Sequence, residues 1–238
     1  MIMQQDGIKF QILDGRVSVR SVTDSVKDIV IPASIEYDGE TLPVTRISQC
    51  AFINCKSIES VVIPDTVTDI GKLAFASCSS LKSVILPKSI TAIKEATFLY
   101  CGSLDSITIP DSVTLIDYRA FCECTSLSSV SLSNGITRIA SAAFYKCYNL
   151  KDITIPDSVV TIGSEAFHYC PALTSINMPS NIKKIERLAF VDCPKISKVI
   201  FNQELVDRPD ADKIFKLMID AGLKTKEVLL RQATDAAE

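Results

Sequence analysis

The stretch IPDSVVTIGSEAFHYC, residues 155 to 170, holds the pattern that decides the fold. Phenylalanine recurs every 23 residues along the chain, and a cysteine follows each phenylalanine three positions later. The seven phenylalanines are Phe52, Phe75, Phe98, Phe121, Phe144, Phe167 and Phe190. Aliphatic residues recur in the same register, so one unit reads L-x-x-I-x-I-P-x-x-V-T-x-I-x-x-x-A-F-x-x-C-x-x. A fixed period of this kind predicts a stack of similar structural units.

Each unit contains a short alternating segment, of which SITIP at 106 to 110 is an example. A period of two with β-branched residues predicts a strand, which the proline ends. Stacked units would pair these strands in parallel at ~4.8 Å, as roughly eight coils with ladders of equivalent side chains inside. We expect the phenylalanine ladder to stabilise the stack most, because each buried ring removes a large apolar area from water.

The unit resembles the leucine-rich repeat of the BspA-like (bacterial surface protein A-like) family, whose pattern IPxxVTxIGxxAFxxC matches residues 155 to 170 closely. The resemblance covers at least residues 29 to 201. We therefore expect an α/β repeat solenoid, a right-handed leucine-rich-repeat coil with a parallel strand ladder. The resemblance also implies a bacterial protein at the cell surface or secreted, which adheres to proteins of a host or a neighbouring cell.

The two ends of the chain depart from the repeat and predict caps. FQIL and RVSV flank Asp14-Gly15, which predicts a hairpin over residues 7 to 22 within an N-terminal β cap at 1–28. The solenoid would occupy 29–205, and its first unit, 28 to 55, is enlarged by an insertion around Asp38 and Gly39.

Residues 206–238 predict a C-terminal helical cap. Ile214, Leu217, Met218 and Ala221 share one helical face that ends at Gly222. Thr225 would cap a second helix through LLRQATDAAE. The alternative for this helical hairpin is a docking module or a dimer contact.

Charge and hydropathy narrow the classes of partner. The chain has 25 basic and 28 acidic residues and no run of like charge, which predicts no nucleic-acid partner. No segment approaches the ~20 continuous apolar residues of a membrane span, and the start MIMQQDGIKF lacks the features of an export signal. A surface protein would carry a signal and an anchor, so either the sequence is trimmed or the protein is cytoplasmic. The sequence leaves the oligomeric state open.

Motifs for catalysis, metals and cofactors are missing from the sequence. The single histidine, His168, occupies a position that other units fill with Ile53, Ala76, Leu99, Cys122, Tyr145 and Val191. A zinc site needs about four ligands, and the chain has neither paired CxxC motifs nor a second histidine. There is no GxSxG, phosphate-binding loop or dinucleotide fingerprint. We expect no enzyme, no metal and no cofactor.

Seven of the nine cysteines belong to the repeat and predict a ladder of small buried side chains. Neighbouring Cβ atoms at ~4.8 Å would be farther apart than the ~3.8 Å that a disulfide prefers. Cys50 and Cys122 lie outside the ladder and are the candidates for reactive thiols.

The outer positions of the strands form the candidate binding site. They are Val62, Ile85, Thr108, Ser131, Thr154, Asn177 and Ile200. In a solenoid they would line one regularly ridged face that suits an extended protein partner, with Val62 and Ile85 as adjacent exposed aliphatics. The alternative is that short polar side chains merely fit the close strand spacing.

A second candidate surface is an aromatic set near the Phe-to-Cys segments. It consists of Tyr100, Tyr145, Tyr148 and Tyr169 with His168. Tyrosine is favoured in interfaces and is also a common half-buried filler. The sequence therefore predicts a non-enzymatic protein-binding module of surface or adhesion type. The alternative is an intracellular interaction scaffold that uses the solenoid face and the C-terminal helices.

Overall fold

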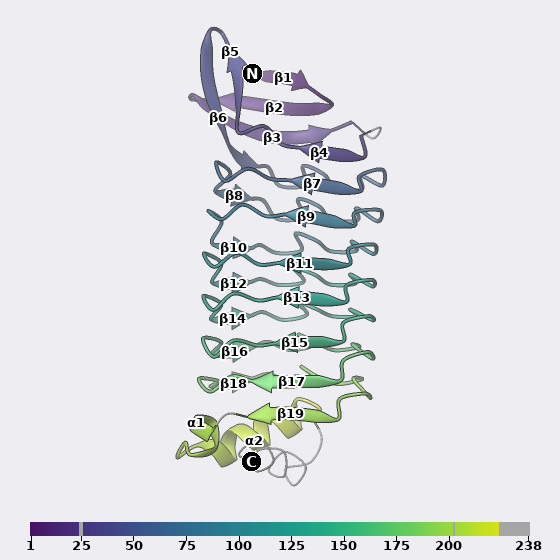
Figure 1. Ribbon diagram of the computed structural model, residues 1–238, viewed down its shortest axis with the longest axis vertical. Helices are drawn as coiled ribbons and strands as arrows, with labels where there is room; N and C mark the ends of the chain where they lie inside the picture. Colours follow the sequence, from purple (N-terminus) through teal and green to yellow (C-terminus); the bar gives the residue numbers. More distant parts are fainter. Residues whose placement is uncertain (24–25, 202, 224–238) are drawn as a thin grey trace.

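The computed structural model describes residues 1–23, 26–201 and 203–223, and its coils stack into one elongated solenoid (Figure 1). One strand from each coil lies on the side that we call the strand face. These strands are β4 (Asp28–Val30), β7 (Ser60–Val62), β9 (Ser83–Ile85), β11 (Ser106–Thr108), β13 (Ser129–Ser131), β15 (Asp152–Thr154), β17 (Ser175–Met178) and β19 (Lys198–Phe201). Neighbours pair in parallel as two sheets, β4-β7-β9 and β11-β13-β15-β17-β19. The expected stack of about eight coils with 23-residue spacing is confirmed.

A second ladder of shorter parallel strands lies on the other side of the coil. It consists of β8 (Asp69–Ile70), β10 (Ala92–Ile93), β12 (Leu115–Ile116), β14 (Arg138–Ile139), β16 (Thr161–Ile162) and β18 (Lys184–Ile185). β10 to β18 form one sheet, whereas β8 pairs with β6 of the N-terminal sheet. The sequence pattern predicted one strand per unit and missed this one, because a two-residue strand is too short to show a period of two.

The Phe-to-Cys segment of each coil is a series of turns and contains no helix in the described repeats. Among the described residues, helices occur only after the last coil, so the expected α/β character holds only for the C-terminal end. Each coil turns through two non-glycine residues with φ between 53° and 64°, placed two positions before and two after the phenylalanine. The first set is Cys50, Leu73, Ala96, Arg119, Ala142, Glu165 and Leu188, and the second is Asn54, Ser77, Tyr100, Glu123, Lys146, Tyr169 and Asp192.

These left-handed positions predict an asymmetric response to glycine. Ser77 has φ 62°, so Ser77→Gly relieves a conformational cost of ~1–2 kcal/mol and should raise the free energy of unfolding by about 0.5–1 kcal/mol. Ser80, three residues later, lies outside the left-handed set. Ser80→Gly should therefore lower the free energy of unfolding by about 0.5–1 kcal/mol, because glycine increases the conformational entropy of the unfolded chain. Urea unfolding of both variants measures the difference, and equal effects would contradict the argument.

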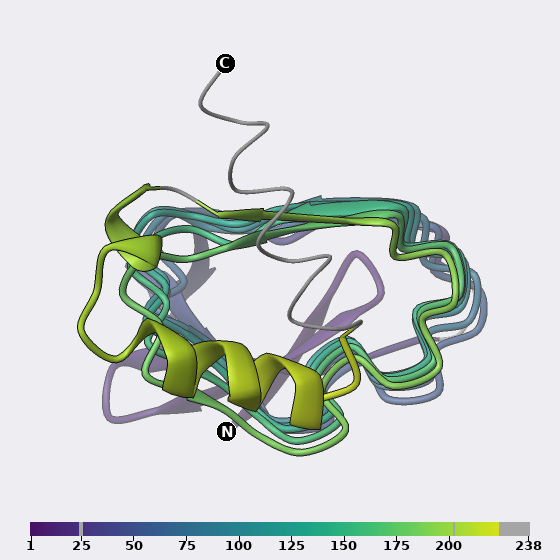
Figure 2. The same ribbon diagram turned by 90° about the horizontal axis from the view of Figure 1, so that it is seen from below.

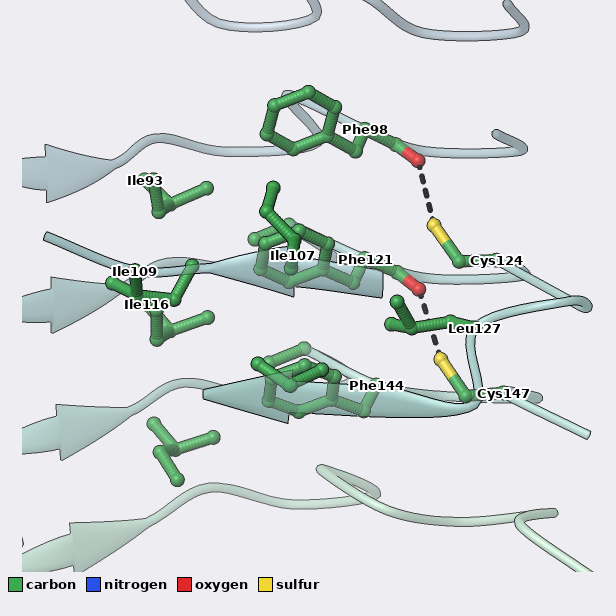
Figure 3. Close-up of a cluster of buried hydrophobic side chains, with 14 of the residues drawn as sticks. Ile93, Phe98, Ile107, Ile109, Ile116, Phe121, Cys124, Leu127, Phe144 and Cys147 are labelled. Atoms are coloured by element: carbon green, nitrogen blue, oxygen red, sulfur yellow. Dashed lines mark hydrogen bonds between the residues drawn. The ribbon is translucent and has the colours of Figure 1, made fainter. Parts of the chain in front are cut away.

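The phenylalanine ladder runs through the core as expected. Successive rings lie 5.3–5.4 Å apart from Phe75 to Phe190 with interplanar angles of 4–8°, and all seven rings are buried. Figure 3 shows three of these rings beside the isoleucines of both ladders. Because each ring between Phe52 and Phe190 contacts one ring above and one below, the ladder couples successive coils.

The cysteine ladder is buried and free of disulfides, and it makes a contact that the sequence did not predict. From Cys78 onward, each ladder thiol donates a hydrogen bond to the backbone carbonyl of the phenylalanine in the preceding coil, and Figure 3 shows two of these bonds. The pairs are Cys78 with Phe52, Cys101 with Phe75, Cys124 with Phe98, Cys147 with Phe121, Cys170 with Phe144 and Cys193 with Phe167, at 3.0–3.2 Å. Burial raises the pKa of the Cys78 thiol to about 12, so this donor keeps its proton at neutral pH.

The N-terminal end is covered by antiparallel strands. The predicted hairpin forms from β2 (Ile8–Leu13) and β3 (Arg16–Val22), and β1 (Ile2–Gln5) adds a third strand through a second turn at Asp6-Gly7. The insertion around Asp38 and Gly39 is itself a hairpin of β5 (Ser34–Tyr37) and β6 (Glu40–Ile47). The sheet order β1-β2-β3-β6-β5 joins this cap to the first coil.

The C-terminal end carries α1 (Gln203–Val206) and α2 (Ala211–Asp220), which lies across the end of the stack on the β18 side (Figure 2). Ile214, Met218 and Ala221 are buried as predicted, whereas Leu217 is half-buried. The carbonyl of Ala221 accepts a 2.8 Å hydrogen bond from the Phe190 amide, in the place that an alanine of the next coil, or Thr97 in one case, takes elsewhere. The predicted second helix and Thr225 lie outside the described residues.

Candidate protein-binding face

The sequence-predicted binding residues all lie at outward positions of the strand face. Ile85, Thr108, Ser131 and Thr154 are exposed, whereas Val62, Asn177 and Ile200 are half-buried. They alternate with buried residues such as Val61, Ile107 and Ile153, as the period of two predicts. Strand pairing sets them side by side, with Val62 opposite Ile85, Thr108 opposite Ser131 and Asn177 opposite Ile200. The described helices lie at the end of the stack and on the β18 side, so they do not cover this face (Figures 1 and 2).

One end of the strand face carries a contiguous apolar surface, which we call the aliphatic patch: Val30, Val62 and Ile85. Val30 pairs with Val62, and Val62 pairs with Ile85, on the three strands of one sheet. Val30 is 70% exposed and Ile85 is 61% exposed. The expected pair of adjacent aliphatics is therefore a row of three. Val30 was missed because its spacing to Val62 is lengthened by the insertion, although IVIP at 29 to 32 matches VVIP at 61 to 64.

A cavity of about 560 Å³ adjoins the aliphatic patch where β9 and β11 meet. Its lining includes Ile85, Leu86, Thr108 and Ile109. The two strands belong to different sheets, so the ladder on this face is interrupted at the cavity. The cavity therefore forms an opening beside Ile85, between two strands that are not paired.

Two rows of charge run along the solenoid on either side of the patch. The first charge row is Lys27, Glu59, Lys82 and Asp105, and the second is Asp65, Lys88 and Asp111. The Glu59 carboxylate accepts a 2.6 Å hydrogen bond from Lys82 Nζ, and its other oxygen lies 3.2 Å from Lys27 Nζ. The hydrogen bond from Lys82 is the largest cause that holds the pKa of the Glu59 carboxyl below its ordinary value, and the hydrogen bond from Lys27 is the second. In both rows the sign alternates from coil to coil.

The aromatic set lies on the edge of the coil and is only partly exposed. Tyr100, Tyr148 and Tyr169 are exposed, whereas Tyr145 and His168 are half-buried. His168 stacks on Tyr169 at 4.5 Å between ring centroids, and its Nε2 lies 3.1 Å from an oxygen of Asp192. Its Nδ1 is buried without a hydrogen-bond partner among the described residues. His168 also meets Tyr145 of the preceding coil edge to face, at 5.5 Å between ring centroids, so both residues are part of the packing between coils.

The candidate reactive thiols differ from expectation. Cys122 is buried, and its burial raises the pKa of the thiol to about 11, so its interpretation as a reactive thiol is wrong. Only Cys50 of the two is partly exposed. Across residues 1–23, 26–201 and 203–223, no three histidine, cysteine, aspartate or glutamate residues gather as metal ligands would. None of the helices in that part of the chain has the length and apolar character to cross a bilayer.

Comparison with known proteins supports the repeat family. The family model described as "BspA type Leucine rich repeat region (6 copies)" matches residues 23–116, 45–172 and 92–211. The solved leucine-rich repeat protein of T. pallidum is 24% identical with a TM-score of 0.76, over 94% of this chain and 97% of that chain. A leucine-rich repeat protein from Bacteroides ovatus is 24% identical with a TM-score of 0.54, over 84% of this chain and 70% of that one.

These two structures show the same fold as this chain. A comparison with curated proteins gives no significant match. The overlapping family matches cover well over half of the sequence, from residue 23 to residue 211. The chain belongs to the BspA-type leucine-rich repeat family.

Proposed function

We propose that the chain is a non-enzymatic protein-binding module that holds a protein partner on its strand face. The observation that carries this proposal is the aliphatic patch beside the cavity between β9 and β11. A contiguous exposed apolar surface with polar residues around it is typical of a protein interaction site. The paired strands hold the patch in place before binding, which lowers the ordering cost of association.

Membership of the BspA-type family supports a bacterial surface or adhesion role for this module. The runner-up is an intracellular scaffold that uses the solenoid face and the C-terminal helices. Treatment of intact source cells with a protease that cannot enter them separates the two. Loss of the protein while a cytosolic control survives supports adhesion, and protection that ends on lysis supports the scaffold.

The strand face itself can be tested by photo-cross-linking. A photoreactive amino acid at Ser131, which pairs with Thr108 of the cavity lining and so lies within reach of a partner seated there, should give an adduct with the partner in source-cell material. The substitutions Thr108→Lys and Thr154→Lys on the flanking strands should abolish that adduct, because two long charged side chains then stand on either side of it. Both threonines are exposed, so the melting temperature should stay within the error of the wild type.

The matched control is the same photoreactive residue at Tyr148, which is exposed on the edge of the coil. It should give no adduct with this partner. An adduct from Ser131 that survives the double lysine variant would contradict the assignment of the strand face.

A further inference from the structure

We propose that the aliphatic patch and the two charge rows bind a second copy of this chain, with the strand faces of the two copies packed against each other. The inference rests on the proposed use of the strand face for protein binding and names its partner. It follows from the order of the charges along the solenoid, which makes the surface complementary to itself.

A two-fold axis that runs parallel to the strands, between β7 and β9, generates this dimer. The axis reverses the order of the coils. Equivalent outward residues of successive coils form a column along the solenoid, and each column then lies opposite the same column of the second copy. Val62 then faces Ile85 of the second copy, and Ile85 faces its Val62. The two most central side chains of the interface are thus aliphatic, and the two solenoids run antiparallel.

The same axis pairs opposite charges in both rows. In the first charge row, Glu59 faces Lys82 of the second copy, and Lys27 faces its Asp105. In the second charge row, Asp65 faces Lys88 of the second copy. Complementary charges of this kind fix the register of an interface and suppress other arrangements.

A two-fold axis that runs along the solenoid, instead of parallel to the strands, would also pack the two strand faces together, but the same charges disfavour it. It would bring the first charge row against the second, with each coil opposite its own equivalent. Glu59 would then face Asp65, and Lys82 would face Lys88, and such like-charge contacts oppose association. The alternation therefore selects antiparallel solenoids.

The ends of the interface fit in shape as well as charge. The axis places Val30 opposite Thr108 of the second copy, beside the cavity between β9 and β11. Val30 is 70% exposed and projects from the first coil. Each copy thus offers one valine and one cavity, and the two-fold axis joins both pairs.

The footprint covers four strands, which at ~4.8 Å spacing is less than 20 Å along the solenoid. Such an area is below the ~1,600 Å² of a standard stable interface. We therefore expect a weak dimer with a Kd of roughly micromolar or higher, which needs a concentration series to detect.

Sedimentation velocity of the full chain over such a series is the test. The wild type should shift from monomer to dimer as concentration rises. Glu59→Lys should remain monomeric because the introduced lysine then faces Lys82, and Lys82→Glu should remain monomeric because two glutamates then face each other. An equimolar mixture of the two variants should dimerise again, because the lysines of one chain then face the glutamates of the other.

Lys72 and Glu95 provide the matched control. They form a similarly exposed ion pair, 2.7 Å apart and also one coil apart, away from the strand face. Lys72→Glu and Glu95→Lys should leave the dimer unchanged. Ile85→Lys should abolish dimerisation with no change in melting temperature, since Ile85 is 61% exposed.

A wild type that stays monomeric at every concentration would overturn the inference, and so would a mixture of the two charge variants that fails to associate. If a wild type that stays monomeric still cross-links a different protein through Ser131, the inference of a second copy as the partner is wrong, but the proposed protein-binding function stands. If Ser131 also gives no adduct, the proposed function fails with it.

Discussion

Replacement of Phe121 by alanine is expected to lower the free energy of unfolding by about 3–5 kcal/mol, the usual cost of removing a fully buried ring. Phe121 lies in the middle of the ladder, and its ring centroid is 5.3 Å from that of Phe98 and 5.3 Å from that of Phe144. The neighbouring rings are held by their own coils, so they cannot collapse into the space. The variant therefore loses apolar burial and keeps a cavity. Urea unfolding followed by circular dichroism measures the difference.

Tyr148→Ala is the control for this substitution, because it also removes an aromatic ring, but one at the exposed edge of a coil. Tyr148 is 42% exposed and lies outside the stack, so its loss should change stability by about 0.5 kcal/mol or less. If Phe121→Ala cost no more than the control, the phenylalanine ladder would not be the main stabilising feature of the core.

Gly222→Ala is expected to detach the C-terminal cap at a cost of roughly 2–4 kcal/mol, from a left-handed backbone penalty and an overpacked contact. Gly222 has φ +103°, and an added Cβ would lie 2.9 Å from the backbone nitrogen of Val191. The preceding carbonyl, of Ala221, accepts the hydrogen bond from the Phe190 amide. Hydrogen exchange at that amide should therefore accelerate in the variant.

Gly15→Ala separates the two contributions. Gly15 has φ +68°, and an added Cβ would meet no atom within 4 Å, so only the backbone penalty of ~1 kcal/mol applies. Exchange at Phe190 should stay slow in this variant. Equal losses in the two variants would show that the contact with Val191 is unimportant for the cap.

The sequence predicts the core of this protein well because every coil buries side chains at the same repeat positions. The position of Phe121 in the interior follows from six equivalents at the same spacing, and one coil confirms another. The turns could not be predicted in the same way. Arg119 and Glu123 adopt φ of 54° and 58°, although neither is a residue type that favours the left-handed region. Pairing with the neighbouring coils imposes that conformation, and a single unit carries no local signal for it.

The candidate site was predicted in outline for the same reason. Alternation places Thr108 and Ile85 outside, but it does not reveal the break between β9 and β11 or the cavity there. β9 and β11 have the same alternation of exposed and buried residues, so the sequence pattern carries no mark of the break between them. The hydrogen bond from Cys124 to Phe98 depends on geometry between coils. Cysteine was expected there only as a small apolar residue.

The hairpin of β5 and β6 shows how this architecture can change without losing its fold. Asp28 pairs with Ser60, 32 residues later, whereas Ser60 pairs with Ser83 after 23, so the first coil carries nine residues more than the others. Both ladders nevertheless continue through it in register, since Ile47 of β6 pairs with Ile70 of β8. The corner that follows each strand-face proline is therefore a place where new sequence can be accepted at little cost. Evolution or protein engineering could add recognition loops there, one coil at a time, while the ladders stay constant.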